Sequence, residues 1–447
     1  MRHFSLLSRI FATFAIFWFG NVNAATAESE AERVTREGAP ARIIKYRQGD
    51  VSLQVIGTDG KPIAGVKVQV HQARHEFLFG CNIFALEQLQ KTNPAMAQKY
   101  GDQFAEIFNF ATLPFYWWSY EREQDKPEHA SRKAVAKWCK EHNITTKGHP
   151  LLWNFGEAKW LPDATKKVQQ LQLARTEDCV ATFRDEIQVW DVVNEATNFN
   201  RGSCQKRAPK LTQTWQEVGQ DEFTRQAFHA ARKGNPKATL LINDYDVSPK
   251  YAELVKKIVD KKGAPLYDVI GLQSHMHGGV WSTAKVWQVC ERFKPFNKPL
   301  HFTELTILSG AKGWQRPKPW PSTPEGEAEQ AKEVKRIYTL LFSHPSVEAI
   351  TWWDFADLRA WQGAPAGLLR DDLSPKPAYK ALRKLIKEDW WTTQDLTTDA
   401  SGTAKFRGFH GDYNVTITLP DGKKKTMKGL QILRATGEKP TSWRLAF

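Results

Sequence analysis

Hydrophobic and polar residues alternate in two short segments near the start of the chain. Residues 51, 53 and 55 are apolar in one segment and residues 66, 68 and 70 in the other, with Asp59-Gly60 between them. A period of two is typical of strands that are buried on one face. We therefore expect a linker followed by a small β lead-in over residues 28–75.

The middle of the chain alternates short apolar runs with longer stretches of helical period, the clearest at 331–342. Eight strand–helix units predict an α/β fold, a (β/α)8 TIM barrel over residues 76–390. An open doubly wound sheet is the alternative, but it usually has a glycine-rich phosphate loop after its first strand, which is missing here. The eight expected strand regions are 76–84, 108–114, 145–153, 187–195, 239–246, 268–277, 299–307 and 348–357.

Strand-like alternation returns after the barrel. Segments 405–409 and 413–419 alternate, and turn sequences lie at Gly402 and at Asp421-Gly422. We expect a small C-terminal β element over residues 391–447 that caps the barrel, with a separate binding role as the alternative.

The first residues have the pattern of an export signal. The basic residues Arg2 and Arg9 precede an apolar run at 10–19, and small residues such as Ala25 follow it. The run is too short to cross a bilayer comfortably, so an uncleaved anchor is the less favoured alternative. We predict a signal peptide over residues 1–27 and a secreted or periplasmic protein without membrane contact after its removal.

Charge and cysteine content narrow the functional classes. The formal net charge of +14 favours acidic partners such as nucleic acid or acidic polysaccharide. No nucleic-acid motif accompanies the charge, so we predict no nucleic-acid partner, while an anionic glycan stays an alternative. The cysteines are scattered, unlike a metal site, and their odd number leaves at least one without a partner in the chain. We expect buried free thiols, with one bridge as the alternative, for Cys81, Cys139, Cys179, Cys204 and Cys290.

Two glutamates lie at the ends of predicted strands. Glu195 ends the fourth strand region after Asn194, and Glu304 follows Thr303 in the seventh. Burying a lone carboxylate is costly, so each needs a partner or a function. Active sites of these barrels lie at the C-terminal strand ends, and glycoside hydrolysis requires two carboxylates. One strand-end glutamate alone is more often a structural ion pair, so the hypothesis depends on finding both.

Histidine, amide and aromatic residues follow other strand regions. Histidine and glutamine can bind sugar hydroxyls, and tryptophan offers a flat apolar face to a sugar ring, although each alone is more often structural. His275 and His277 have no acidic or cysteine partner at ligand spacing, so we predict no metal and no cofactor. The candidate substrate-binding residues are His149, Trp153, Asn194, Tyr245, Gln273, His275, Trp353 and Trp361.

Six segments together resemble glycoside hydrolase family 10, the endo-β-1,4-xylanases. They occur in the family's order and cover roughly residues 76 to 387. Flanking segments at 76–80 and 407–413 resemble the plant-like branch of that family. The six segments are KGHPLLW at 147–153, WDVVNE at 190–195, NDY at 243–245, GLQSH at 271–275, FTEL at 302–305 and KPAY at 376–379.

The resemblance implies a retaining double displacement, in which the two carboxyl groups lie about 5 to 5.5 Å apart. Glu195 matches the acid/base, Glu304 the nucleophile, and Asn194 the residue that binds the sugar 2-hydroxyl. His149 and Gln273 match residues that line the subsite of the cleaved sugar. His275 matches the histidine beside the nucleophile, and Trp353 and Trp361 match aromatic walls.

Two positions depart from the family pattern. The family's second strand continues into Glu-Asn and then Lys-Trp, which bind sugars on the non-reducing side, whereas residues 112–118 read TLPFYWW. The family usually has Asp two residues after the nucleophile, beside the histidine, and this chain has Thr306. A site that loses groups for binding hydroxyls loses discrimination between sugars.

These features predict a monomeric retaining glycoside hydrolase that cleaves β-1,4-linked, xylan-like plant-wall polysaccharide, with the polysaccharide or its oligosaccharides as partner. One alternative is the same mechanism on a decorated or acidic glycan. The other is a non-catalytic carbohydrate-binding protein on the same barrel, against which the two retained glutamates argue.

Overall fold

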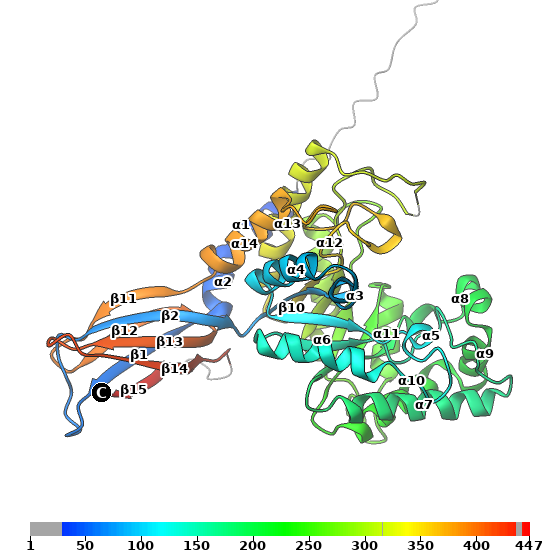
Figure 1. The fold of residues 1–447 in the computed structure, drawn as a ribbon, viewed down its shortest axis with the longest axis horizontal. Helices are drawn as coiled ribbons and strands as arrows, with labels where there is room; N and C mark the ends of the chain where they lie inside the picture. The colour runs from blue at the N-terminus through cyan, green and yellow to red at the C-terminus, as the bar shows by residue number, and fades with distance from the viewer. Residues whose placement is uncertain (1–28, 315, 435–439) are drawn as a thin grey trace, which may run out of the picture.

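A computed structural model describes residues 29–314, 316–434 and 440–447 of the chain. Figure 1 shows a barrel surrounded by helices, with an elongated β lobe beside it. The predicted signal peptide lies outside the described residues. Among the described residues, no helix is both long enough and apolar enough to cross a membrane.

Eight strands form a closed barrel in the order β10-β3-β4-β5-β6-β7-β8-β9, and every neighbouring pair is parallel. Seven strands fall within the predicted regions, and the eighth, β10, begins one residue before its region at 348–357, so the predicted (β/α)8 fold is confirmed. The strands are β3 (Leu78–Asn82), β4 (Phe110–Pro114), β5 (Thr145–His149), β6 (Val189–Asn194), β7 (Thr239–Asp244), β8 (Val269–Leu272), β9 (Leu300–Leu305) and β10 (Val347–Trp352).

Helices connect the strands and cover the outside of the barrel (Figure 1). They are α3 (Phe84–Thr92), α4 (Pro94–Ile107), α5 (Trp117–Tyr120), α6 (His129–Glu141), α7 (Thr165–Thr182), η1 (Ala196–Asn198), α8 (Gly202–Arg207), α9 (Pro209–Val218), α10 (Gln220–Gly234), α11 (Pro249–Lys257), α12 (Thr283–Phe293), η2 (Lys294–Phe296), α13 (Pro324–Ser343), η3 (Trp361–Gly363), α14 (Pro377–Lys384) and η4 (Leu385–Asp389).

Helix α13 contains the predicted helical segment 331–342 and shows why such a helix forms. The Thr323 side chain accepts a hydrogen bond from the backbone N–H of Gly326, and Pro324 occupies the first turn. Glu325 and Glu327 place negative charge at the positive end of the helix dipole. The apolar face of α13 is buried in the core that surrounds the barrel.

Close packing between β5 and β6 depends on a glycine. A Cβ atom on Gly148 would lie 2.2 Å from Cζ3 of Trp190, which is fully buried. Beside this contact, Lys147 Nζ lies 2.8 Å from Asp191 Oδ2, and neither side chain is exposed to solvent. A buried ion pair of this kind needs both partners, because either charge alone would be strongly destabilised.

The two β elements expected at opposite ends of the chain form one β lobe of two sheets. Strand β1 (Gln48–Ile56) lies between β12 (Thr403–Phe409) and β15 (Thr441–Ala446). Strand β2 (Lys67–His75) lies between β11 (Thr393–Thr397) and β13 (Gly411–Thr418), and β14 (Lys424–Ile432) pairs with β13. Their inward apolar residues share one core, which includes Val51, Leu53, Val68, Val415 and Trp443.

The segment expected as a linker contains two helices, α1 (Glu30–Glu37) and α2 (Ala39–Arg47). Ser29 and Glu32 form a capping box that starts α1. Arg47 at the end of α2 is buried and donates hydrogen bonds to the carbonyl oxygens of Phe342, His344 and Val347 at 2.6 to 2.7 Å. Helix α2 is therefore packed against the barrel.

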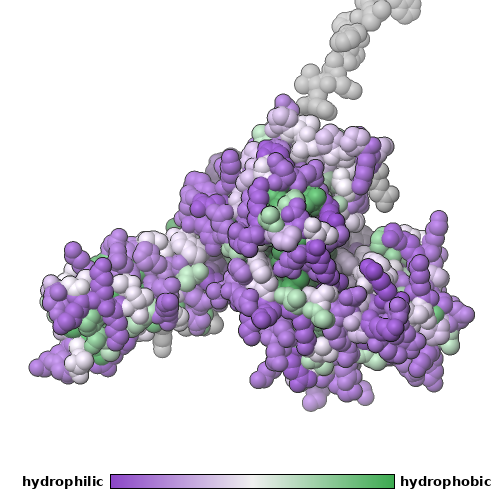
Figure 2. All heavy atoms as spheres, viewed as in Figure 1, coloured by the Kyte–Doolittle hydropathy of each residue, from purple (hydrophilic) through white to green (hydrophobic). Residues whose placement is uncertain are grey.

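The face shown in Figure 2 is mainly hydrophilic, with small apolar patches. All five cysteines are buried free thiols, so no disulfide joins them. Burial raises the pKa of Cys290 well above its usual value and that of Cys139 to about 12, so these thiols stay protonated at neutral pH.

Candidate active site

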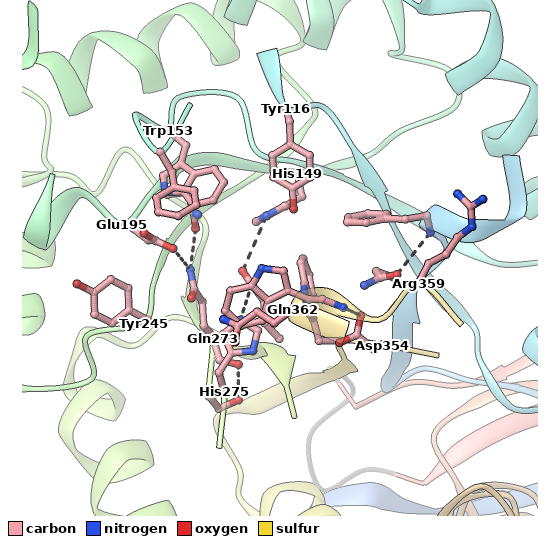
Figure 3. Close-up of a pocket in the computed structure, with 18 of the residues that line it drawn as sticks. Tyr116, His149, Trp153, Glu195, Tyr245, Gln273, His275, Asp354, Arg359 and Gln362 are labelled. Atoms are coloured by element: carbon pink, nitrogen blue, oxygen red, sulfur yellow. Dashed lines mark hydrogen bonds and ion pairs between the residues drawn. The ribbon is translucent and has the colours of Figure 1, made fainter. Parts of the chain in front are cut away.

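The strand ends of the barrel surround a pocket of about 760 Å³. All the residues predicted from the sequence line this pocket, and Figure 3 shows most of them around it. They come from the ends of different strands, which is why residues distant in sequence meet. They are Glu195, Glu304, His149, Trp153, Asn194, Tyr245, Gln273, His275, Trp353 and Trp361.

Glu195 directly follows β6 and has a positive φ of 59°. A non-glycine residue in this left-handed region carries a conformational cost that surrounding contacts must offset. Its Oε1 atom accepts a hydrogen bond of 3.1 Å from Gln273 Nε2, and its Oε2 atom pairs with the Arg201 guanidinium. The carboxylate is therefore turned into the pocket and held there from two sides.

Glu304 lies on β9 and is 4% exposed. Its Oε1 atom accepts a hydrogen bond of 2.9 Å from Asn243 Nδ2, and its Oε2 atom lies 3.0 Å from His275 Nε2. Burial raises the pKa of Glu304 to about 7, although His149 and Lys147 act in the opposite direction. Near neutral pH this carboxyl group therefore exchanges readily between its two protonation states.

Three amide side chains connect the two carboxyl groups. Asn194 Oδ1 accepts hydrogen bonds from Asn243 Nδ2 at 2.9 Å and from Gln273 Nε2 at 3.2 Å. Gln273 also reaches Glu195, and Asn243 also reaches Glu304. A continuous hydrogen-bond network thus fixes one carboxyl group relative to the other. Asn243 was not among the residues predicted for the site, although it occupies the strand end two residues before Tyr245.

His149 is oriented by a buried acidic residue. Its Nδ1 atom lies 2.7 Å from Asp191 Oδ2, and its Nε2 atom points toward Glu304, 4.0 Å from Oε1. Burial acts to raise the pKa of Asp191, but Lys147 and His149 outweigh it and the pKa is lowered. Asp191 is therefore ionised and holds the imidazole in one orientation.

Thr306 lies beside His275, with its Oγ1 atom 3.0 Å from His275 Nδ1. Burial lowers the pKa of His275 to about 4, so the imidazole is neutral around pH 7. A neutral imidazole can donate a hydrogen bond from Nε2–H to Glu304 while its Nδ1 atom accepts a hydrogen bond from the Thr306 hydroxyl group. The replacement of the family's Asp by Thr306 therefore leaves His275 without an adjacent charge on this side.

Aromatic residues follow the second barrel strand, β4, at the place where the family pattern has Glu-Asn and then Lys-Trp. Tyr116 lines the pocket, with its ring 5.6 Å from the His149 ring and 4.9 Å from Trp118, on which it stacks. Trp153 lies 5.7 Å from Tyr116 and 5.9 Å from Trp118. One wall of the pocket is thus a continuous aromatic surface, suited to the apolar faces of sugar rings.

The pocket also contains residues that the sequence did not predict for the site. At one end, Asp354 accepts a hydrogen bond of 3.0 Å from the backbone N–H of Trp361, and burial raises its pKa to about 7. At the other end, Arg201, Arg207 and Phe155 line the pocket near Glu195. The nearness of Arg201 and Arg207 to Glu195 in the sequence is the one signal that could have indicated them.

The fold and the site define a (β/α)8-barrel protein of glycosidase type, with two carboxyl groups joined by an amide network at the strand ends. The chain belongs to glycosyl hydrolase family 10, whose model matches residues 72–385. The matched residues make up about two thirds of the chain and include the whole barrel.

Curated relatives are similar over most of this chain. Anti-sigma-I factor RsgI6 of Acetivibrio thermocellus is 26% identical over 417 residues, which cover 91% of this chain and 50% of that protein. Endo-1,4-beta-xylanase 2 of Arabidopsis thaliana is 25% identical over 394 residues, covering 85% of this chain and 33% of the relative. The chain thus spans half or less of the length of these two relatives.

A solved structure shows the same fold. Xylanase 10B from Thermotoga petrophila, in complex with xylobiose, superimposes with a TM-score of 0.59 at 22% sequence identity. The match covers 70% of this chain and 95% of the xylanase. The uncovered part of this chain is large enough to hold the β lobe.

Proposed function

We propose that this protein is a retaining glycoside hydrolase that cleaves β-1,4-linked, xylan-like polysaccharide. The observation that carries the proposal is the amide network that holds Glu195 and Glu304 in one pocket. Membership of family 10 and the similarity to proteins named endo-1,4-beta-xylanase support the substrate class.

In the first step, Glu304 attacks the anomeric carbon as a carboxylate, while Glu195 donates a proton to the leaving oxygen. The C–O bond to the leaving sugar breaks, and a glycosyl ester forms on Glu304. His275 and Asn243, which contact the two oxygens of Glu304, position the attacking carboxylate.

In the second step, Glu195 removes a proton from a water molecule that attacks the glycosyl ester. The ester bond breaks, Glu304 is released as a carboxylate, and the sugar keeps its original configuration. The Arg201 guanidinium stabilises the ionised Glu195 that this step requires. Substrate binding must weaken this ion pair, because Glu195 has to hold a proton in order to donate it in the first step.

The aromatic wall of Tyr116, Trp118 and Trp153 supports binding through stacking in place of hydrogen bonds to hydroxyl groups.

We also propose that the protein acts outside the cytoplasm after removal of its signal peptide, and that it acts as a monomer. A polymeric plant-wall substrate is accessible only from outside the cell.

The test compares hydrolysis of an aryl β-xylobioside with other aryl β-glycosides and soluble xylan. We expect xylosides to be cleaved, and Glu304→Ala to lower kcat/KM about 10⁴-fold or more. Glu195→Ala should keep slow turnover of an activated aryl glycoside, which azide accelerates by forming the β-glycosyl azide. Turnover of another glycoside alone, still dependent on Glu304, would replace the substrate but keep the mechanism.

A binding function without catalysis is the second candidate, because one relative that matches most of the chain is named an anti-sigma factor. In that case xylo-oligosaccharides would bind with measurable affinity and no glycoside would be turned over. Calorimetric titration combined with product analysis separates the two functions.

A further inference from the structure

Two arginines lie together at one end of the pocket. Arg201 and Arg207 both line it, at the two ends of the α8 segment that follows Glu195. The Arg207 Cζ atom lies 4.1 Å from the centre of the Phe155 ring, and the Arg201 Cζ atom lies 5.5 Å from the same centre. Tyr245 adds a second ring, 5.5 Å from Arg201. The result is a cluster of two guanidinium groups and two aromatic rings.

The two guanidinium groups differ in what they bind. Arg201 pairs with Glu195 and donates to Asn198 O and Ser203 Oγ. Arg207 is exposed, and it has no hydrogen bond or ion pair with any residue in the described parts of the chain. Its guanidinium group lies over the face of Phe155, which leaves the N–H donors free for a ligand.

This cluster lies on the side of the pocket that would receive the leaving group. Figure 3 shows Glu195 and Tyr245 at one side, and Asp354 and Arg359 at the other. An acid that protonates the leaving oxygen faces the sugar beyond the cleaved bond. Arg207, beside Arg201, therefore faces the leaving-group sugar.

We infer that Arg207, with Arg201 and Phe155, forms a subsite for the carboxylate of a uronic acid carried by the leaving-group part of the glycan. This inference rests on the proposed function, because that function assigns the leaving-group side. A guanidinium group binds a carboxylate through two parallel hydrogen bonds, and the Phe155 face limits its movement. Apart from Glu195, no acidic side chain lines this end of the pocket among the described residues.

The charge of the whole chain favours the same ligand. Its formal net charge is +14, and a positive surface raises the rate at which a polyanion meets the protein. Long-range attraction acts on any negative polymer, however, so the test must separate it from a local contact. Lys206 offers the control, because it neighbours Arg207 in α8, is exposed, and does not line the pocket.

The experiment uses two substrates that differ in one group. One is a β-1,4-xylo-oligosaccharide that carries a single glucuronic acid, and the other is the same oligosaccharide after reduction of its carboxyl group to an alcohol. The measured quantity is the ratio of kcat/KM for the acidic substrate to that for the reduced one. We expect Arg207→Gln to lower this ratio about tenfold, the effect of losing a charged hydrogen-bond partner. Lys206→Gln should leave the ratio within about twofold of the wild type, and added salt should lower it in the wild type.

An unchanged ratio in Arg207→Gln, or an equal fall in Lys206→Gln, would overturn the subsite while leaving the proposed hydrolysis intact. If the wild type hydrolyses neither substrate, the proposed function fails, and calorimetric titration of both oligosaccharides then tests the subsite. Tighter binding of the acidic form that Arg207→Gln abolishes would support the subsite without hydrolysis. Equal binding of both forms, or binding of neither, would overturn it.

Discussion

At the scale of single residues, burial controls the protonation of the candidate nucleophile. Glu304 is almost completely buried, and its pKa is raised to about 7, whereas burial lowers the pKa of His275 to about 4. Both shifts favour the neutral form of the group. Near pH 7, His275 is therefore neutral and Glu304 is close to the pH at which it changes its protonation state. The pH dependence of activity should therefore report on Glu304.

Activity should fall as the pH drops below about 7. Glu304 attacks only as a carboxylate, and protonation through its pKa of about 7 removes that form. The measurement is kcat/KM for an aryl β-xyloside between pH 5 and 9, over which the acidic limb should show an apparent pKa close to 7. A flat profile down to pH 5 would contradict this assignment.

Replacing Thr306 by Asp should move the acidic limb to lower pH by about one unit. A carboxylate near His275 Nδ1, which now lies 3.0 Å from Thr306 Oγ1, raises the pKa of the imidazole. The resulting imidazolium beside Glu304 then lowers the pKa of the nucleophile. Thr306→Asn, which adds similar volume without charge, is the control and should leave the limb in place. An equal shift in both variants would point to a change in packing.

At the scale of elements, the alignment of β5 and β6 decides where the site residues lie. Trp190 packs over Gly148, and Lys147 pairs with Asp191 within the barrel. His149 and Glu195 follow on the same two strands, so the contacts below the pocket support the groups in it. Asp191 belongs to both parts, because it binds Lys147 and orients His149.

Lys147→Met should reduce the free energy of unfolding by about 3–5 kcal/mol, because it leaves Asp191 charged and buried without its partner. Urea unfolding followed by circular dichroism measures the change. Lys137→Met, at a lysine whose side chain is 77% exposed, should change stability by less than about 1 kcal/mol. Similar losses in both variants would mean that the buried pair is not the cause.

At the scale of the whole molecule, the two ends of the chain depend on each other. Strand β1 pairs with β12 and β15, and β2 pairs with β11 and β13, so the lobe contains residues from both sides of the barrel segment. The barrel holds these ends together, which reduces the entropy cost of pairing strands that are far apart in sequence.

Trp443→Ala should destabilise the β lobe by about 3–5 kcal/mol, since Trp443 is 6% exposed within the core shared by both chain ends. Hydrolytic activity at 25 °C should stay near that of the wild type, because the pocket lies in the barrel. Thermal unfolding and kcat/KM are measured together, with exposed Lys424→Ala as the control. A large loss of activity at temperatures where the variant is folded would show that the lobe affects the site.

The sequence alone was sufficient for the barrel and for most of the site. Seven of the eight strands are short, mainly apolar runs, and the period of the intervening segments is that of a helix, so local pattern determines most of the elements. Strand β5 is the exception, because its sequence is TTKGH. Glu195, Glu304, Gln273 and His275 could be predicted because parallel strands in a barrel bring their C-terminal ends to one mouth. Position in the strand is then enough to indicate position in space.

Only the tertiary structure decided the remaining features, because they depend on contacts between segments whose local patterns do not refer to each other. The strands at 48–56 and 441–446 have ordinary alternation, and nothing in either one specifies its partner. Arg207 lies in a short helical segment, and a loop or short helix can turn its side chains to solvent or to a pocket with the same sequence pattern. Packing between segments that are distant in sequence determines the orientation: Arg207 lies over Phe155 beside the candidate acid. The same kind of packing joins the two ends of the chain into one lobe.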